Sequence, residues 1–375
     1  MKVDWLIVGA GFTGATLAER IATGLNQKVL VVEERNHIGG NAYDYYNEHG
    51  ILVHKYGSHT FHTNSKVVWD YLSQFTRWRP YFHEVRAVVD GQKIPVPFNL
   101  NSLSAVFSSH QAEELERALV RQYGLGKKVS IFSLRKSAEG ELVFLADFIY
   151  NQIFHRYTLK HWNLKPEELD PSVCARVPVV ISRDNRYFQD TYQGIPLPGF
   201  TEMFCKMLQH PNIKLLLNTS YGEVAQDIQY QRMIFTGPID SFFQYKHGSL
   251  PYRSMRFHME TFQKEWYQEV GTVNYPNEYD FTRVLEHKHL TGQVSPKTTV
   301  TFVYPEHYTP GVNEPYYPIP HKENSLRYAL YKQEAEKMRD KVLFAGRLAD
   351  YQYYNMDQAV ARALTLYKQI ADGSV

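Results

Sequence analysis

Apolar residues near the start of the chain occur in short blocks separated by a helical pattern. The first block fills residues 3–8 (VDWLIV) and the second fills 28–32 (KVLVV), lengths that are typical of buried strands. Between them, Leu17, Ile21 and Ala22 recur at the spacing of one helix face. The pattern predicts a strand–helix–strand unit whose two strands run parallel.

A glycine-rich turn, residues 9–14 (GAGFTG), joins the first strand to the helix, and Glu33 follows the second strand. In such a turn Gly9 permits the tight bend, Gly11 lets the backbone approach a pyrophosphate, and Gly14 lets helix and strand pack closely. The helix N-terminus offers N–H groups and a positive dipole to that pyrophosphate. Glu33 accepts hydrogen bonds from ribose hydroxyls and disfavours a 2′-phosphate, so NADP is not expected. The spacing therefore predicts a dinucleotide-binding domain.

The residues after the second strand favour FAD over NAD as the dinucleotide. Arg35 is followed by Gly39, Gly40 and Asn41, and this stretch resembles the FAD-binding families, in which it lies along the cofactor. The alternative is an ordinary loop with two turn glycines. The residues that this region contributes to the expected cofactor site are Gly9, Gly11, Phe12, Thr13, Gly14, Glu33, Glu34, Arg35, Gly40 and Asn41.

The rest of the chain changes its pattern twice. Residues 111–159 have apolar positions three and four apart and read as helical, whereas 216–303 alternate and favour an antiparallel sheet. A strand at 341–345 and an amphipathic helix at 356–370 then return to the first domain. We expect an α/β protein with a discontinuous FAD-binding Rossmann-like domain, an inserted helical bundle and an antiparallel β-sheet domain. The expected boundaries are 1–78, 190–240 and 318–375 for the first, 79–180 for the helical domain with a mobile substrate loop, and 181–189 with 241–317 for the sheet domain.

Charge and cysteine content narrow the classes of partner. Lys and Arg total 41 against 39 Asp and Glu, a net charge of +2, which does not fit a nucleic-acid-binding protein. An anionic ligand would have to be held by a few local arginines. Cys174 and Cys205 are too few for a disulfide framework, so a reducing, cytoplasmic compartment is the simplest interpretation. The sequence shows no signal peptide and no apolar run of about 18–20 residues, so no membrane span is expected.

Several short motifs, spread in order along the chain, together identify a family. They are 56–62 (YGSHTFH), 157–162 (YTLKHW), 175–178 (ARVP), 237–240 (GPID), 281–283 (FTR), 286–288 (EHK), 315–318 (PYYP), 346–347 (GR) and 353–357 (YYNMD). With them, essentially the whole chain resembles the UDP-galactopyranose mutase family.

The resemblance implies a reaction, a cofactor and an assembly. Members interconvert the pyranose and furanose forms of galactose attached to UDP, for cell-surface polysaccharide biosynthesis. The N5 atom of reduced FAD attacks the anomeric carbon, and there is no net oxidation. A cofactor that supplies the nucleophile fits a sequence without an evident Ser/His/Asp or Cys/His arrangement. A homodimer is also implied.

The same resemblance assigns residues to the substrate. Arg176 and Arg283 correspond to two arginines that bind the diphosphate and act in catalysis, a role that suits bidentate guanidinium groups. Arg176 lies in a stretch, 163–183, that is a mobile loop in the family. The remaining substrate residues are Tyr187, Tyr317 and Tyr353 for the phosphates, Phe154 and Tyr157 for uracil, Trp162 near the sugar, and Asn274.

The resemblance also extends the cofactor site beyond the first domain segment. His59 and His62 lie beside the flavin, and His62 is the catalytic contact. The remaining members are Arg347, Tyr353, Met356 and Asp357, at or before the start of the last predicted helix. A metal site at His54, His59 and His62 is not expected, because no carboxylate or cysteine accompanies them and their spacing fits no common zinc pattern.

Four positions depart from the family pattern and leave the exact sugar open. Ser58 stands where Pro is usual, Glu84 where a basic residue is common, Asn163 where Gly is usual, and Val303 where Glu is common. A sister mutase acting on dTDP-fucose or UDP-N-acetylgalactosamine is therefore an alternative. Two more distant alternatives are a flavin oxidoreductase of the amine oxidase type and a flavin-binding protein without catalytic activity.

Overall fold

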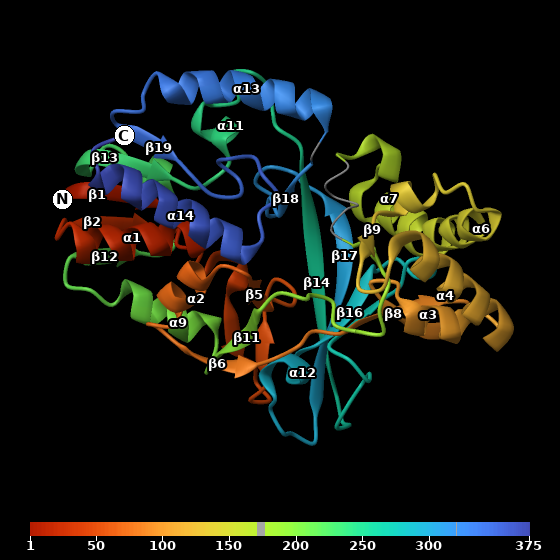
Figure 1. The fold of residues 1–375 in the computed structure, drawn as a ribbon. Coiled ribbons are helices and arrows are strands. Elements are labelled where there is room, and N and C mark those ends of the chain that lie inside the picture. The colour runs from red at the N-terminus through yellow and green to blue at the C-terminus, as the bar shows by residue number, and fades with distance from the viewer. Residues whose placement is uncertain (171–176, 320) are drawn as a thin grey trace. The chain divides into compact units, whose positions relative to one another are not determined.

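The structure is a computed structural model that describes residues 1–170, 177–319 and 321–375. The chain, coloured by residue number in Figure 1, forms two compact units. Unit 1 comprises Met1–Tyr81, Asp190–Ser254 and Tyr308–Val375, and unit 2 comprises Phe82–Gln189 and Met255–His307. The predicted Arg176 site lies outside the described residues. No helix in the described part of the chain has the length and apolar character needed to cross a membrane.

Unit 1 is built on a parallel sheet of five strands. Its order is β12 (Ile213–Leu216), β2 (Val29–Val32), β1 (Lys2–Val8), β13 (Gln229–Phe235) and β19 (Val342–Phe344). The blocks at 3–8 and 28–32 form the predicted adjacent strands, and the strand predicted at 341–345 joins the same sheet. Residues 229–235 correct the expectation of an antiparallel sheet throughout 216–303, because they pair parallel with β1.

Helices cover one face of this sheet through a shared apolar core. That core unites Ile7 and Val31 with side chains of α1 (Phe12–Gly24), α9 (Phe200–Leu208) and α14 (Met356–Ala371). Alternate strand residues, such as Leu6 and Leu30, enter a second core on the other face. Figure 1 shows α14 lying along α1.

The other elements of unit 1 include a small antiparallel sheet, several short strands and helices, and one 15-residue helix. An antiparallel sheet has the order β5 (Phe61–Thr63), β11 (Tyr192–Leu197) and β6 (Arg77–Pro80). The remaining elements are η1 (Gly40–Ala42), β3 (Asp44–Tyr46), β4 (Leu52–His54), α2 (Lys66–Leu72), α10 (Tyr221–Val224), α11 (Ile239–Phe242), β18 (Tyr317–Pro318) and α13 (Lys322–Glu336).

Unit 2 combines a mainly antiparallel sheet with a group of helices. The sheet order is β14 (Tyr252–Phe262), β17 (Thr298–His307), β16 (Arg283–Glu286), β15 (Thr272–Asn274), β7 (Val85–Val89) and β8 (Gln92–Val96). Strand β14 begins in unit 1, where it pairs with β18, and β15 pairs parallel with β7 in unit 2.

Several helices of unit 2 share one core with strands β7 and β8. Val89 and Ile94 pack in the same cluster as Leu115, Leu145 and Ile149. The elements are α3 (Leu100–Val106), α4 (Ser109–Tyr123), β9 (Lys128–Val129), α5 (Ile131–Leu134), α6 (Gly140–Ile149), a π-helical turn η2 (Tyr150–His155), α7 (Arg156–Trp162), η3 (Pro166–Glu168), β10 (Val179–Val180) and α12 (His287–Thr291).

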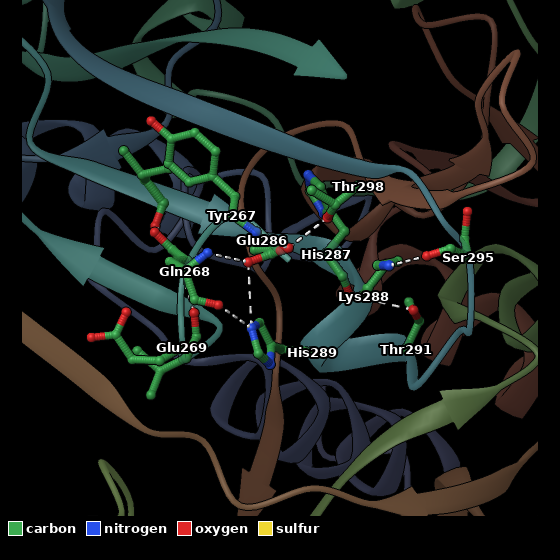
Figure 2. Close-up of polar contacts among 12 residues, drawn as sticks. Tyr267, Gln268, Glu269, Glu286, His287, Lys288, His289, Thr291, Ser295 and Thr298 are labelled. Atoms are coloured by element: carbon green, nitrogen blue, oxygen red, sulfur yellow. Dashed lines mark hydrogen bonds and ion pairs between the residues drawn. The ribbon is translucent and has the colours of Figure 1, made fainter. Parts of the chain in front are cut away.

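A buried carboxylate holds the end of strand β16, as Figure 2 shows. Glu286 accepts hydrogen bonds from the backbone N–H groups of Tyr267 and Gln268, both at 2.9 Å, and from the hydroxyl of Thr298 at 2.6 Å. The ring of His289 lies 3.4 Å away from the same carboxylate. Burial by itself raises the pKa of Glu286, but these hydrogen bonds outweigh it and hold that pKa below its ordinary value. The ionised carboxylate therefore joins β16 to the segment before β15.

We expect Glu286→Gln to destabilise the protein by about 2–3 kcal/mol at pH 7, because the amide cannot replace a charged acceptor of three hydrogen bonds. The folded-state pKa is depressed, so the stability it adds is present above the unfolded-state pKa and is lost as pH falls through the folded value. Urea unfolding of both proteins should thus give a difference that shrinks from pH 7 towards about pH 4. A difference that stays constant across this range would contradict the assignment.

Candidate functional site

The turn between β1 and α1 has no room for a side chain at Gly9 or Gly14. A Cβ on Gly9 would lie 2.2 Å from Oγ1 of Thr236, and one on Gly14 would lie 1.9 Å from the carbonyl oxygen of Gly9. Gly9 also has a φ of +100°, which disfavours any residue with a Cβ. Gly11 caps α1 without a side-chain hydrogen bond, so the first N–H groups of a 13-residue helix face the turn. The result is a backbone cradle suited to a pyrophosphate.

The end of β2 presents a fixed carboxylate beside this cradle. Glu33 is 6% exposed, and its two oxygens accept the backbone N–H groups of Ala10 at 2.8 Å and Arg35 at 3.0 Å. The guanidinium of Arg35 binds Oδ1 of Asn41 at 3.0 Å and Glu314 at 2.6 Å, and lies over the ring of Tyr56. Sequence reasoning proposed Glu33 for a ribose, and its two backbone hydrogen bonds fix the orientation of its carboxylate.

The cradle opens into a pocket of about 920 Å³ in unit 1. Its walls include thirteen of the predicted cofactor residues: Gly9, Gly11, Phe12, Thr13, Gly14, Glu33, Glu34, Arg35, Gly40, Asn41, His59, Arg347 and Met356. His62, Tyr353 and Asp357 lie outside this lining. The volume and the glycine-lined floor fit the pyrophosphate part of a dinucleotide.

The predicted site residues did not include three parts of this pocket. Residues 219–222 and 236–238 follow the parallel strands β12 and β13, and 310–316 form a separate loop that brings Glu314 to Arg35. The first two stretches lie at the carboxyl ends of sheet strands, where open α/β sheets bind ligands. A sequence prediction that placed β12 and β13 in the parallel sheet would have located these two stretches. Two of the three parts carried a further signal, because the motifs at 237–240 and 315–318 overlap them.

The predicted histidines of unit 1 are held by defined partners. Nδ1 of His62 lies 3.0 Å from Oδ2 of Asp190, which orients the imidazole. Nδ1 of His59 lies 2.8 Å from the carbonyl oxygen of Gly57. Burial, with a smaller contribution from His54, lowers the pKa of His59 to about 3, so this imidazole is neutral at pH 7. Within the described ranges, no three His, Cys, Asp or Glu side chains are grouped to hold a metal ion.

The start of α14 brings the C-terminal residues of the predicted site together. Arg347 lies over the ring of Tyr317, at 5.4 Å, and Nη2 donates to the carbonyl oxygen of Tyr354 at 2.8 Å. Tyr317 in turn packs edge-on against Tyr353 at 4.7 Å. Oδ2 of Asp357 accepts the hydroxyl of Thr63 at 2.9 Å. A cation therefore lies near the N-terminus of a 16-residue helix.

The predicted substrate residues of unit 2 fall into two groups. Phe154, Tyr157 and Trp162 follow one another along η2 and α7. Asn274 and Arg283 lie directly opposite each other on the antiparallel strands β15 and β16. Antiparallel partners place their side chains on the same face.

The remaining predicted site residues are Tyr187 and two residues whose buried side-chain oxygens, here called orphan oxygens, lack a hydrogen-bond partner in the described part of the chain. Tyr187 donates its backbone N–H to the carbonyl oxygen of His83. Among the residues that the structure describes, Oδ1 of Asn274 and Oδ1 of Asp357 are buried oxygens without a hydrogen-bond partner. Buried polar atoms are rarely left so, and both belong to residues that the sequence assigned to ligands.

For three of the four residues that depart from the family pattern, the structure shows the backbone conformation or the strand partner. Asn163 ends α7 with a φ of +56°, a left-handed position that Gly favours and Asn tolerates. Val303 pairs with Arg283 on β17, so its methyl groups occupy the place opposite the guanidinium. Glu84 forms a β-bridge with Arg186. Asn163 thus preserves the helix end, whereas Val303 changes the chemistry beside Arg283.

The parallel sheet, the glycine cradle and the acid at the end of β2 define a dinucleotide-binding protein of the Rossmann type. A family model described as "NAD(P)-binding Rossmann-like domain" matches residues 7–75, and one described as "UDP-galactopyranose mutase" matches 152–353. The chain belongs to the UDP-galactopyranose mutase family, and it is therefore an enzyme of the isomerase class.

Individual relatives agree over nearly the whole chain. The sequence is 34% identical to a probable UDP-galactopyranose mutase of Klebsiella pneumoniae, covering 96% of this chain and 92% of that one. It is 33% identical to a dTDP-fucopyranose mutase of Escherichia coli, covering 96% of each. A crystal structure of a reduced UDP-galactopyranose mutase shares the fold at a TM-score of 0.74 and 16% identity, covering 99% of this chain and 96% of that one.

Proposed function

We propose that this enzyme binds FAD in the pocket of unit 1 and, with the flavin reduced, interconverts UDP-galactopyranose and UDP-galactofuranose. The observation that carries the proposal is the glycine cradle beneath a pocket of about 920 Å³ in a chain of the mutase family. FAD is favoured over NAD because the pocket continues along Arg35, Gly40 and Asn41, as the FAD-binding families imply.

The residues of unit 1 bind and tune the cofactor. The first N–H groups of α1 bind the pyrophosphate, and the fixed carboxylate of Glu33 accepts the ribose hydroxyls. Reduced flavin carries negative charge on its ring, so Arg347 and the N-terminus of α14 stabilise the active redox state. His62, oriented by Asp190, is the proposed polar contact of the flavin and the sugar. When bound and reduced, FAD supplies the nucleophile for the anomeric carbon.

The residues of unit 2 bind the nucleotide and stabilise its departure. Arg283 pairs with diphosphate oxygens, and this contact strengthens as UDP gains negative charge on leaving. Arg176, outside the described residues, is assigned the same role. Tyr187 donates its hydroxyl to the phosphates, and the family resemblance assigns the same role to Tyr317 and Tyr353, which belong to unit 1. Phe154 and Tyr157 hold the uracil ring, and Trp162 contacts the sugar. The orphan Oδ1 of Asn274 gives the ligand an acceptor beside Arg283.

Action on dTDP-fucose is the second candidate function. The identities to the Klebsiella pneumoniae and Escherichia coli relatives, 34% and 33%, do not separate the two substrates. Val303 opposite Arg283 is the observation that favours a changed substrate, because it replaces a carboxylate that is common in the family with methyl groups.

The test is conversion by the purified, flavin-loaded enzyme. The enzyme is reduced with dithionite and incubated with UDP-galactofuranose, and UDP-galactopyranose is followed by chromatography against an oxidised control. Conversion in the reduced sample alone is expected. Turnover of dTDP-fucofuranose or UDP-N-acetylgalactofuranosamine instead would select a sister mutase. Failure to bind UDP or dTDP, or amine-dependent oxygen consumption, would overturn the proposal.

A further inference from the structure

A lysine of α7 is surrounded by carbonyl oxygens of a distant loop. Nζ of Lys160 donates to the carbonyl oxygens of Tyr275 at 2.7 Å, Glu278 at 2.9 Å and Phe281 at 3.3 Å. An ammonium group has three N–H donors, and all three find acceptors here. Burial lowers the pKa of Lys160, and the carboxylate of Asp280 acts in the opposite direction. The three carbonyl groups take the place of the water that this partly buried charge has lost.

The loop that Lys160 binds is compact in its own right. The backbone N–H of Tyr275 donates to the carbonyl oxygen of Thr282 at 2.9 Å, which closes residues 275–282 at their base. The rings of Tyr279 and Phe281 stack at 4.9 Å. Three carbonyl groups that converge repel one another unless a cation lies between them. The ammonium is therefore part of the loop's structure.

Both ends of this contact lie next to residues proposed to bind the substrate. Lys160 lies between Tyr157 and Trp162 on α7. The loop joins Asn274, at the end of β15, to Arg283, at the start of β16. A second hydrogen bond, here called the second tie, joins the same loop to η2, the turn before α7: Nδ2 of Asn277 donates to the carbonyl oxygen of Gln152 at 3.2 Å.

We propose that Lys160 is a positioning residue for nucleotide-sugar binding: its ammonium fixes the helix that carries the uracil-binding aromatic residues relative to the hairpin that carries Arg283. This inference rests on the proposed function. The uracil and the diphosphate are covalently joined, so their binding groups must be held at one fixed separation. Small misplacements of binding groups weaken productive binding strongly. Lys160 provides that separation without touching the substrate.

The experiment compares three variants of the full flavin-loaded enzyme in UDP binding by calorimetry and in amide hydrogen exchange. Lys160→Met keeps the side-chain length and removes the charge, and should weaken UDP binding about tenfold or more. Exchange in 275–282 should accelerate, and flavin content should be unchanged. Lys160→Arg should recover part of the affinity, and Asn277→Ala, which removes only the second tie, should show a smaller effect in the same direction.

The matched control is Lys288, a fully buried lysine of the same unit that donates to the carbonyl oxygen of Ser295 at 2.6 Å (Figure 2). Lys288→Met should lower the unfolding midpoint and leave UDP affinity unchanged. If Lys160→Met mobilises the loop but binds UDP as the wild type does, Lys160 is only a structural contact and the positioning proposal is wrong. If the wild type binds neither UDP nor dTDP, the proposed function fails, and the positioning proposal fails with it.

Discussion

Gly14→Ala is expected to yield a protein that binds FAD about 100-fold more weakly and is purified largely colourless. The added Cβ would lie 1.9 Å from the carbonyl oxygen of Gly9 and 3.3 Å from the side chain of Ile7. The obstacle at 1.9 Å is backbone, so no side chain can rotate away, and α1 must shift from β1. Overpacking of this kind costs about 3 kcal/mol, and because FAD binding must restore the close packing that the apoprotein relaxes, the cost appears as about 100-fold in affinity. The same shift withdraws the N–H groups of α1 from the pyrophosphate.

Gly140→Ala is the matched control for this substitution. A Cβ on Gly140, the first residue of α6 in unit 2, meets no atom within 4 Å, and alanine favours a helix. This variant should keep its flavin and its unfolding midpoint. Flavin content and FAD affinity, measured by absorbance and by titration of the apoprotein, check both expectations. A Gly14→Ala protein that retains FAD with unchanged affinity would show that the dinucleotide does not lie on the cradle.

The glycine cradle could be predicted because its chemistry is local. The bend at Gly9, the helix start after Gly11 and the close packing at Gly14 depend on neighbours in the sequence, and a short motif encodes them. The same holds for Glu33, which follows its strand directly. Residues 229–235 show the limit of this reasoning. Their pairing with β1 joins segments about two hundred residues apart, and alternation in the sequence does not specify that partner.

The missed parts of the site depend on tertiary arrangement in the same way. Glu314 reaches Arg35 from a loop that is far away in sequence. The π-helical turn at 150–155 was read as ordinary helix, because apolar spacing does not distinguish the two hydrogen-bond patterns. The sequence places Lys160 in the motif at 157–162 but does not indicate its three carbonyl partners, which lie more than one hundred residues further along the chain. Motifs thus predicted a set of site residues, and the structure shows which of them are neighbours.

Arg283→Ala is expected to lower kcat/KM for the nucleotide sugar by about 10²–10³-fold, the effect of removing one group that stabilises charge developing in a transition state. Arg283 lies opposite Asn274, whose buried Oδ1 lacks a hydrogen-bond partner among the described residues. On its other side Val303 offers no carboxylate to compete for the guanidinium. Arg283→Lys should recover only part of the activity, since an ammonium cannot pair bidentately with a diphosphate.

The control is Arg121, a surface arginine of α4 whose side chain is 65% exposed and paired with Glu139. Arg121→Ala should leave kcat/KM and UDP affinity unchanged, because an exposed ion pair contributes little. All variants should hold FAD as the wild type does, since Arg283 belongs to unit 2 and the cradle to unit 1. Equal losses of kcat and kcat/KM would place the contact of Arg283 mainly in the transition state, and a rise in KM alone would place it in substrate binding. A fully active Arg283→Ala enzyme would remove Arg283 from the diphosphate site and leave the family assignment intact.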